Sequence, residues 1–108
     1  MKDLGPIILV EDPFIRNYLR FLLARHGYSV LDTDSSRACE SLRSDGVNVV
    51  ITNEPEPFVS VANQVAVIYL STSPDMDLAA RFKSCQIVRK PFRPEELLAA
   101  VRQLIPSD

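Results

Sequence analysis

Side chains that could do chemistry follow four short apolar runs of this 108-residue chain. Paired carboxylates could hold a hard cation such as Mg²⁺, which takes few protein ligands and keeps several waters. A lysine and a hydroxyl group nearby could bind the oxygens of a phosphate. The pattern therefore indicates a site for a cation and an anion, the alternative being solvated strand ends that form no site. The side chains are Glu11 and Asp12, Asn53 and Glu54, Ser71, and Lys90.

The elements that must position these residues alternate between strand and helix. Such alternation predicts a parallel sheet with right-handed crossovers, and the carboxyl ends of parallel strands meet at one edge of the sheet. The four polar ends are therefore expected to lie together. We expect strands at residues 7–10, 28–33, 47–52, 65–71 and 86–89, and helices at 14–26, 34–44, 73–84 and 93–105.

The segment Glu54 to Gln64 breaks this alternation. It contains Pro55 and Pro57 and shows no helical period. A parallel crossover normally needs a dozen or more residues, and eleven residues must here supply the whole connection. We therefore expect an extended or one-turn crossover in place of a full helix.

The first expected helix has a defined start, end and apolar stripe. Asp12 is the expected N-cap, Pro13 suits the first turn, and Gly27 suits the position after the last turn. His26 is expected to lie in the last turn; a role in phosphotransfer or metal binding is the sharper alternative. The apolar stripe expected to face the core consists of Phe14, Ile15, Tyr18, Leu19, Leu22 and Leu23.

Composition excludes several classes of partner. A formal net charge of −2, with no polybasic run, argues against nucleic acid and against a membrane surface. No apolar run approaches the ~20 residues of a membrane-spanning helix, and the first residues lack the apolar region of a signal peptide. We therefore expect a single domain over 1–108 in the cytoplasm.

Cys39 and Cys85 lack metal-site spacing and are expected to be reduced, packed thiols.

Taken together, these motifs resemble the receiver domain of response regulators, the phosphoacceptor module of two-component signalling. The resemblance runs almost from end to end. The matching stretches are Val10-Glu11-Asp12, Gly27-Tyr28-Ser29-Val30, Asn48-Val49-Val50-Ile51-Thr52-Asn53, Leu70-Ser71, and Lys90-Pro91-Phe92 followed by Glu96-Leu97.

The resemblance implies a fold and a set of site residues. The fold would be a doubly wound, flavodoxin-like five-stranded parallel sheet of order 2-1-3-4-5, with the third helix shortened or lost. Glu11 and Asp12 would hold magnesium with help from the carbonyl of Pro55. Ser71 and Lys90 would contact the phosphoryl group.

Two departures from the family pattern carry the functional hypothesis. Asn53 stands where the family has its phosphorylated Asp, and a neutral carboxamide is a poor nucleophile that cannot form an acyl phosphate. Ile87 replaces the usual aromatic switch residue. We therefore expect a degenerate receiver, or pseudo-receiver, that is not an enzyme and acts in phosphorelay signalling as a phosphorylation-independent interaction module. We expect no cofactor other than, at most, weakly bound magnesium.

The partner would be another protein or a second copy of the chain, with a histidine kinase as one candidate. The shortened crossover is expected to expose an apolar sheet face, partly covered by Phe58, Val59 and Val61, as the interface. One alternative is a working receiver that binds magnesium and is phosphorylated at Asp12 or Glu54. Another is an enzyme on a flavodoxin-like sheet, although the chain lacks a Gly-rich phosphate loop and a His–acid arrangement.

Overall fold

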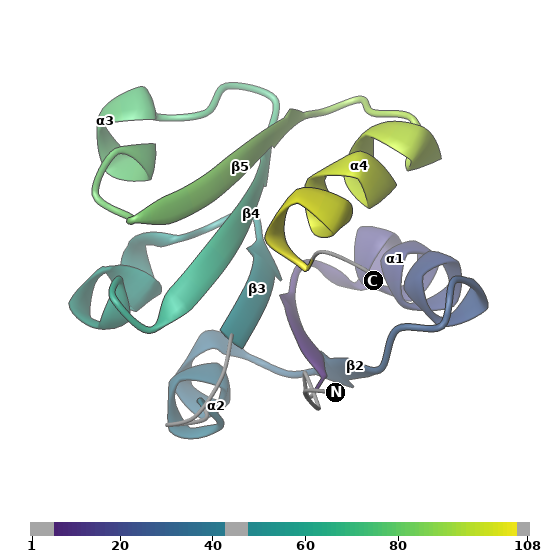
Figure 1. The fold of residues 1–108 in the computed structure, drawn as a ribbon, viewed down its shortest axis with the longest axis horizontal. Coiled ribbons are helices and arrows are strands. Elements are labelled where there is room, and N and C mark those ends of the chain that lie inside the picture. The colour runs from purple at the N-terminus through teal and green to yellow at the C-terminus, as the bar shows by residue number, and fades with distance from the viewer. Residues whose placement is uncertain (1–5, 43–47, 106–108) are drawn as a thin grey trace.

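The computed structural model describes residues 6–42 and 48–105, which form a five-stranded parallel sheet with helices on both faces (Figure 1). The strands lie in the order β2-β1-β3-β4-β5, and every neighbouring pair is parallel. This confirms the expected flavodoxin-like sheet of order 2-1-3-4-5. The strands are β1 (Ile7–Val10), β2 (Val30–Asp32), β3 (Asn48–Thr52), β4 (Val65–Ser71) and β5 (Ser84–Arg89).

The strand β3 lies at the centre of the sheet, and all five of its residues are buried. Successive side chains of a strand point to opposite faces, so both faces of β3 need apolar cover. Ile51 packs into the core on one face and Val50 into the core on the other. In the register, Val50 is the partner of both Ile8 in β1 and Val67 in β4, which brings the carboxyl ends of the three strands to one edge.

The helices α1 (Pro13–Arg25) and α4 (Pro94–Leu104) cover one face of the sheet (Figure 1). Leu19 and Leu23 of α1 and Leu97 of α4 are fully buried there. As expected, α1 begins at Pro13, and its N-cap residue is Asp12, although the Asp12 side chain makes no capping hydrogen bond. At the start of α4, the backbone N–H of Arg93 donates to Glu96 Oε1 at 2.8 Å.

The crossover between β3 and β4 is the short connection that the sequence predicted. It contains a single 3₁₀-helix, η1 (Glu56–Val61), where a full helix would normally lie. The Asn48 Nδ2 atom at the start of β3 donates to the carbonyl of Gln64 at 2.9 Å, which ties the end of the crossover to the sheet. Phe58, with none of its surface exposed, packs into the core on the face covered by η1 and α2 (Ser35–Glu40).

The expected exposed interface at the crossover is wrong. Phe58 is fully buried, and Val59 and Val61 are partly buried against the same core cluster. The 3₁₀ geometry explains this cover, because a rise of about 2.0 Å per residue stretches six residues over about 12 Å. That length is most of the span of a five-residue strand, at about 3.3 Å per residue.

Two helices are shorter than their sequence patterns predicted. The helix α2 ends at Glu40, where the Ser41 hydroxyl donates to the carbonyl of Arg37 at 2.8 Å; its expected continuation through 44 reaches into residues outside the described part. The helix α3 (Met76–Ala79) ends well before Ser84 because β5 starts two residues earlier than expected. Ser84 already pairs with Ala66 of β4, so it has to be extended.

The expected apolar stripe of α1 is only partly correct. Leu19, Leu22 and Leu23 are buried as predicted, and Ile15 packs partly against them. Phe14 and Tyr18, however, are 93% and 43% exposed. The sheet and α4 cover a face of α1 that is narrower than the predicted apolar stripe. The side of the stripe that carries Phe14 and Tyr18 therefore remains in solvent.

Candidate functional site

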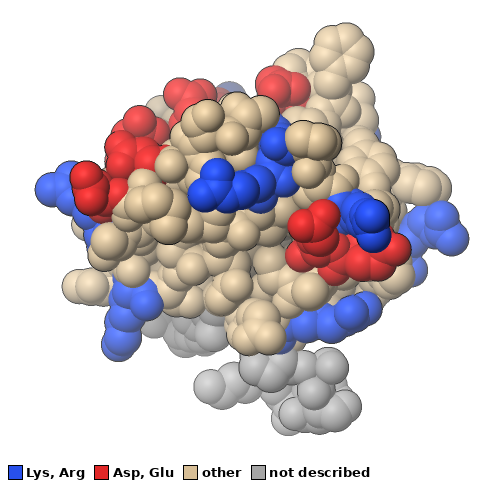
Figure 2. All heavy atoms as spheres, turned by 90° about the horizontal axis from the view of Figure 1, so that it is seen from above, with Lys and Arg blue, Asp and Glu red and all other residues tan. Residues whose placement is uncertain are grey.

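The polar residues singled out in the sequence lie at the carboxyl edge of the sheet. Glu11 and Asp12 follow β1, Asn53 follows β3, Ser71 ends β4, and Lys90 follows β5. The backbone N–H of Lys90 donates to the Ser71 carbonyl at 2.9 Å, which extends the β4–β5 pairing by one bond. Figure 2 looks onto this edge from above and shows that acidic and basic side chains both reach its surface.

An ion pair joins the two ends of the site. Lys90 Nζ lies 3.1 Å from Glu11 Oε2, although β3 and β4 separate the strands that carry these residues. The Glu11 carboxylate has no exposed surface, and its other oxygen, Oε1, accepts a hydrogen bond from the Asp12 backbone N–H at 3.0 Å. Both oxygens of Glu11 are therefore engaged by groups of the protein itself.

The remaining expected magnesium ligands do not complete a metal site. Asp12 is exposed, and the carbonyl of Pro55 accepts a hydrogen bond from the Phe58 N–H at 2.9 Å within the first turn of η1. Among the described residues, no three His, Cys, Asp or Glu side chains form a group that could hold a metal ion. Magnesium prefers anionic oxygen ligands, and here the buried carboxylate is already neutralised by Lys90. This donor set does not fit a resident magnesium ion.

Asn53 occupies the end of β3 as a half-buried residue. The turn that carries it is fixed by Thr52, whose buried hydroxyl accepts from the Glu54 N–H at 3.0 Å and lies 3.3 Å from the Glu54 carbonyl oxygen. Glu54 itself is exposed. The sequence analysis did not single out Thr52. The feature that could have identified it is a hydroxyl residue at the end of a mainly apolar strand.

The side chains of Ser71 and Ile87 are also engaged by other groups of the fold. Ser71 Oγ accepts a hydrogen bond from the Ser73 N–H at 3.0 Å, so this hydroxyl organises the loop after β4. Ile87 is the β5 partner of Tyr69 in β4 and packs partly into the core on the η1 face. The Tyr69 hydroxyl accepts from the backbone N–H of Asp75, which fixes the ring.

The remaining candidate residues lie outside this edge. His26 is exposed at the C-cap of α1, and its backbone N–H donates to the Leu23 carbonyl at 3.1 Å. Cys39 and Cys85 are both free and half-buried. Burial raises the pKa of the Cys85 thiol, which disfavours the reactive thiolate.

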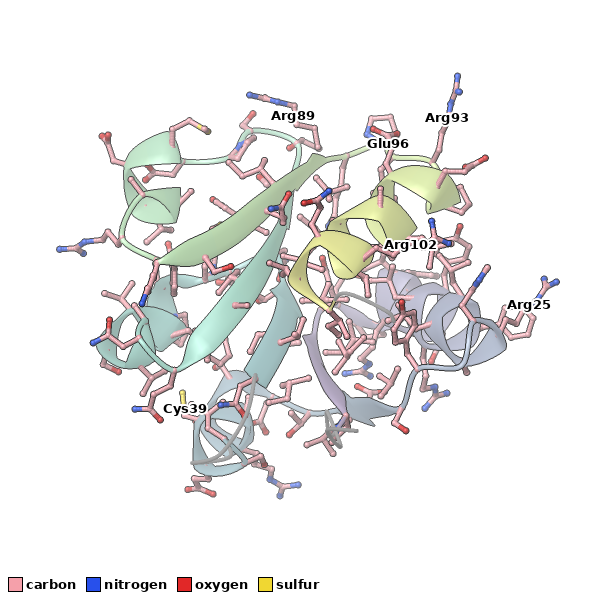
Figure 3. All side chains as sticks on the ribbon, viewed as in Figure 1. Arg25, Cys39, Arg89, Arg93, Glu96 and Arg102 are labelled. Atoms are coloured by element: carbon pink, nitrogen blue, oxygen red, sulfur yellow. The ribbon has the colours of Figure 1, made fainter. Side chains whose placement is uncertain are left out.

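A groove lies beside the edge strand β5, away from the candidate site. Its volume is about 560 Å³, and it is lined by residues of β5 and α4 together with Met76. Asn53, Ser71 and Lys90 do not line it. In Figure 3, Arg89 leaves the end of β5 toward solvent, on the same side of the molecule as Glu96 at the start of α4. The groove is therefore not the space in which Glu11 and Lys90 meet.

A comparison with solved structures finds chains of similar fold. The high-resolution structure of the chemotaxis protein CheY4 from Vibrio cholerae superposes with a TM-score of 0.71, covering 94% of this chain and 99% of that chain. The chain has the receiver-domain fold. The sequence identity to CheY4 is 21%, so the likeness concerns the fold. No protein-family model and no curated protein matches the sequence.

The receiver-domain fold places the expected site residues on the edge where such a sheet collects ligands. The five strands, their order and the flanking helices agree with the sequence-based expectation. Within the described part of the chain, no helix is both long and apolar enough to cross a bilayer.

Proposed function

We propose that this chain is a pseudo-receiver: a cytoplasmic, non-enzymatic interaction module of phosphorelay signalling that binds a protein partner without being phosphorylated. The observation that carries this proposal is Asn53 at the carboxyl end of β3. An acyl phosphate forms when a carboxylate oxygen attacks phosphorus, and the Asn53 carboxamide offers no such oxygen. A histidine kinase is one class of partner that such a module could bind.

The ion pair between Glu11 and Lys90 supports the same proposal. A receiver that accepts a phosphoryl group needs a cation to neutralise the incoming charge and a lysine free to contact it. Here Lys90 already pairs with the buried carboxylate at 3.1 Å. The edge therefore balances its main buried charge without a metal or a phosphate.

Incubation with acetyl phosphate and magnesium tests the proposal directly. We expect intact-protein mass spectrometry to show no phosphoryl adduct, and beryllofluoride with magnesium to leave the NMR signals around Lys90 unchanged. The alternative of a working receiver predicts a labile adduct at one of the exposed carboxylates, Asp12 or Glu54. Detection of that adduct would overturn the proposal.

Replacing Asn53 by aspartate is expected to strengthen magnesium binding at least about tenfold, or about 1.4 kcal/mol. The substitution adds a carboxylate beside Glu11 and Asp12, and Mg²⁺ binds through such groups. Isothermal titration with MgCl₂ measures the effect. Full switching need not return, because Ile87 lacks an aromatic ring.

Asn63→Asp is the matched control for this substitution. Asn63 is exposed beyond η1, before β4 begins, so the same chemical change there adds a charge at the opposite end of the sheet. We expect magnesium binding of this variant to equal that of the parent chain. If Asn53→Asp also left magnesium binding unchanged, residues other than Asn53 would be responsible for the loss of metal binding at this edge.

A further inference from the structure

The strand β5 forms an edge of the sheet whose outer side has no sheet partner in the described part of the chain. It pairs with β4 alone, over its six residues. Figure 1 shows it at the opposite end of the sheet from β2, with α3 beside one face and α4 beside the other. An unpaired strand edge is a template on which another extended segment can pair.

Every second residue of β5 directs its backbone N–H and C=O groups away from β4. The Lys90 N–H donates to the Ser71 carbonyl at 2.9 Å, which fixes the phase of the ladder. The direction of these groups alternates along a strand, so the even-numbered residues of β5 bond to β4. The backbone groups of Cys85, Ile87 and Arg89 therefore point outward, where no described residue bonds to them.

The two edge strands differ in how they are protected from pairing with other chains. The strand β2 has only three residues, and its last residue, Asp32, is ion-paired with Arg16 and Arg20. Short length and charged side chains are common protections of natural edge strands. The strand β5 has six residues, no proline, and no charged residue between Ser84 and Val88. It lacks the protection that β2 has.

Hollowed surface follows β5 along its length. The groove of about 560 Å³ lies beside its carboxyl half, and a second hollow of about 410 Å³ is lined by Lys83 and Ser84 at its amino end. Gln103 of α4 lines both hollows, so they adjoin. The groove is bordered by the small side chain of Ala99 on α4 and by Met76 on α3, which is 56% exposed.

We infer that β5 binds an extended segment of a protein partner, which adds to the sheet as a sixth strand. The backbone of the segment hydrogen-bonds to the outward groups of Cys85, Ile87 and Arg89, and its alternate side chains fill the spaces on the two sides. Those on one side lie over Ala99 and those on the other beside Met76. The segment is therefore expected to carry β-branched side chains on both faces.

The charges at the two ends of β5 indicate what the ends of the segment carry. Lys83 and Arg89 are exposed, and neither forms an ion pair with a residue that the structure describes. The acid that lines the groove, Glu96, already accepts the Arg93 N–H through its Oε1 atom. A segment with an acidic residue at each end complements the two bases.

The same charges disfavour a second copy of the chain at this edge. A two-fold pair of β5 strands is antiparallel, so the Arg89 end of one strand lies beside the partner's Lys83. Like charges at neighbouring cross-strand positions destabilise a strand pair. An acidic-ended segment of another protein is therefore the occupant that this edge favours.

The inference rests on the proposed interaction role and deepens it, because it names the kind of segment that the partner supplies. A six-residue strand buries less than a standard interface of about 1,600 Å². We therefore expect a dissociation constant on the order of 10–100 μM.

Fluorescence anisotropy with a labelled peptide tests the binding. The probe has six residues of alternating valine and threonine, the length of β5, and a glutamate at each end. We expect the full chain to bind it, and to bind the same peptide with a lysine at each end at least about tenfold more weakly. A third peptide, with proline in place of a central valine, loses a backbone donor and should not bind. Equal binding of the three peptides, or no binding of the glutamate-ended peptide, would overturn the inference.

Amide hydrogen exchange measured by NMR identifies the mode of binding. At a saturating concentration of the glutamate-ended peptide, we expect exchange of the Cys85, Ile87 and Arg89 amides to slow at least about tenfold. The amides of Gln86 and Val88 already donate to β4, so their exchange should not change. A bound peptide that left the three outward amides unprotected would contradict strand addition.

Charge reversal tests the ends of the segment. The double variant Lys83→Glu with Arg89→Glu should bind the lysine-ended peptide more tightly than the glutamate-ended one. Both residues are exposed, so circular dichroism should show an unchanged fold. Arg25→Glu is the matched control, because Arg25 is exposed on α1, and this variant should keep the preference of the parent chain. A double variant that also kept that preference would overturn the inference.

Sedimentation of the chain without peptide separates a second copy from another protein. We expect a monomer at the concentrations of the binding experiment, and a dimer with protected Cys85, Ile87 and Arg89 amides would overturn the inference. Failure of the peptide to bind would leave Asn53 as inert as proposed. A phosphoryl adduct would overturn the pseudo-receiver proposal, and the peptide data would still decide the role of β5 on their own.

Discussion

Replacing Phe58 by alanine is expected to lower the free energy of unfolding by about 4 kcal/mol, the range seen when a buried Phe is truncated in a core. The Phe58 ring has no exposed surface and is the fully buried anchor of η1. Phe58 packs in the same core cluster as Val50 of β3, Val67 of β4 and Phe82, so its truncation leaves a cavity among them. Urea denaturation followed by circular dichroism measures the loss.

Phe14→Ala is the matched control for this prediction. It removes the same atoms from a position that is 93% exposed, so the free energy of unfolding should change by less than about 0.5 kcal/mol. Equal changes in the free energy of unfolding for the two substitutions would show that burial of Phe58 does not stabilise the core.

Replacing Lys90 by methionine is expected to destabilise the chain by about 3 kcal/mol at neutral pH. Methionine keeps the length of the side chain but leaves the Glu11 carboxylate buried without its counter-charge. Removing one partner of a buried ion pair typically costs 3–5 kcal/mol, and we take the lower end because Lys90 is 22% exposed. Lys83→Met, at an exposed lysine, is the control and should have an effect near zero.

A double substitution separates the ion pair from simple packing. Glu11→Gln removes the buried charge, so adding it to Lys90→Met should recover at least about 1 kcal/mol of the lost stability. Thermal denaturation of the parent, the two single variants and the double variant provides the complete cycle. Strictly additive losses would mean that the 3.1 Å contact contributes no coupling energy.

The sheet was predictable because its signals are local. Four-to-seven-residue apolar runs, each closed by a polar residue, gave β1, β3 and β4 within a residue or two of their observed bounds. The short crossover followed from Pro55, Pro57 and a simple count of residues. Helix ends were less predictable, because α3 ends where Ser84 has to join β4, a pairing that no local pattern reveals.

The site was predictable in its members but not in its contacts. Parallel strands must bring Glu11, Asn53 and Lys90 to one edge, and the topology does so. The pairing of Lys90 with Glu11 depends on distances between strands that are far apart in the sequence, and these distances cannot be read from the sequence. The exposure of Phe14 and Tyr18 was missed for a related reason: a helical apolar stripe does not tell how much of it the neighbouring elements will cover.

The pairing of Lys90 with Glu11 has a consequence for how such a protein can be controlled. Under the proposed function, Lys90 already supplies the counter-charge of the buried Glu11 carboxylate, so the fold needs no divalent ion at that position. Chelators should therefore leave its melting temperature unchanged. What remains adjustable is the number of molecules present, so its output would follow its abundance.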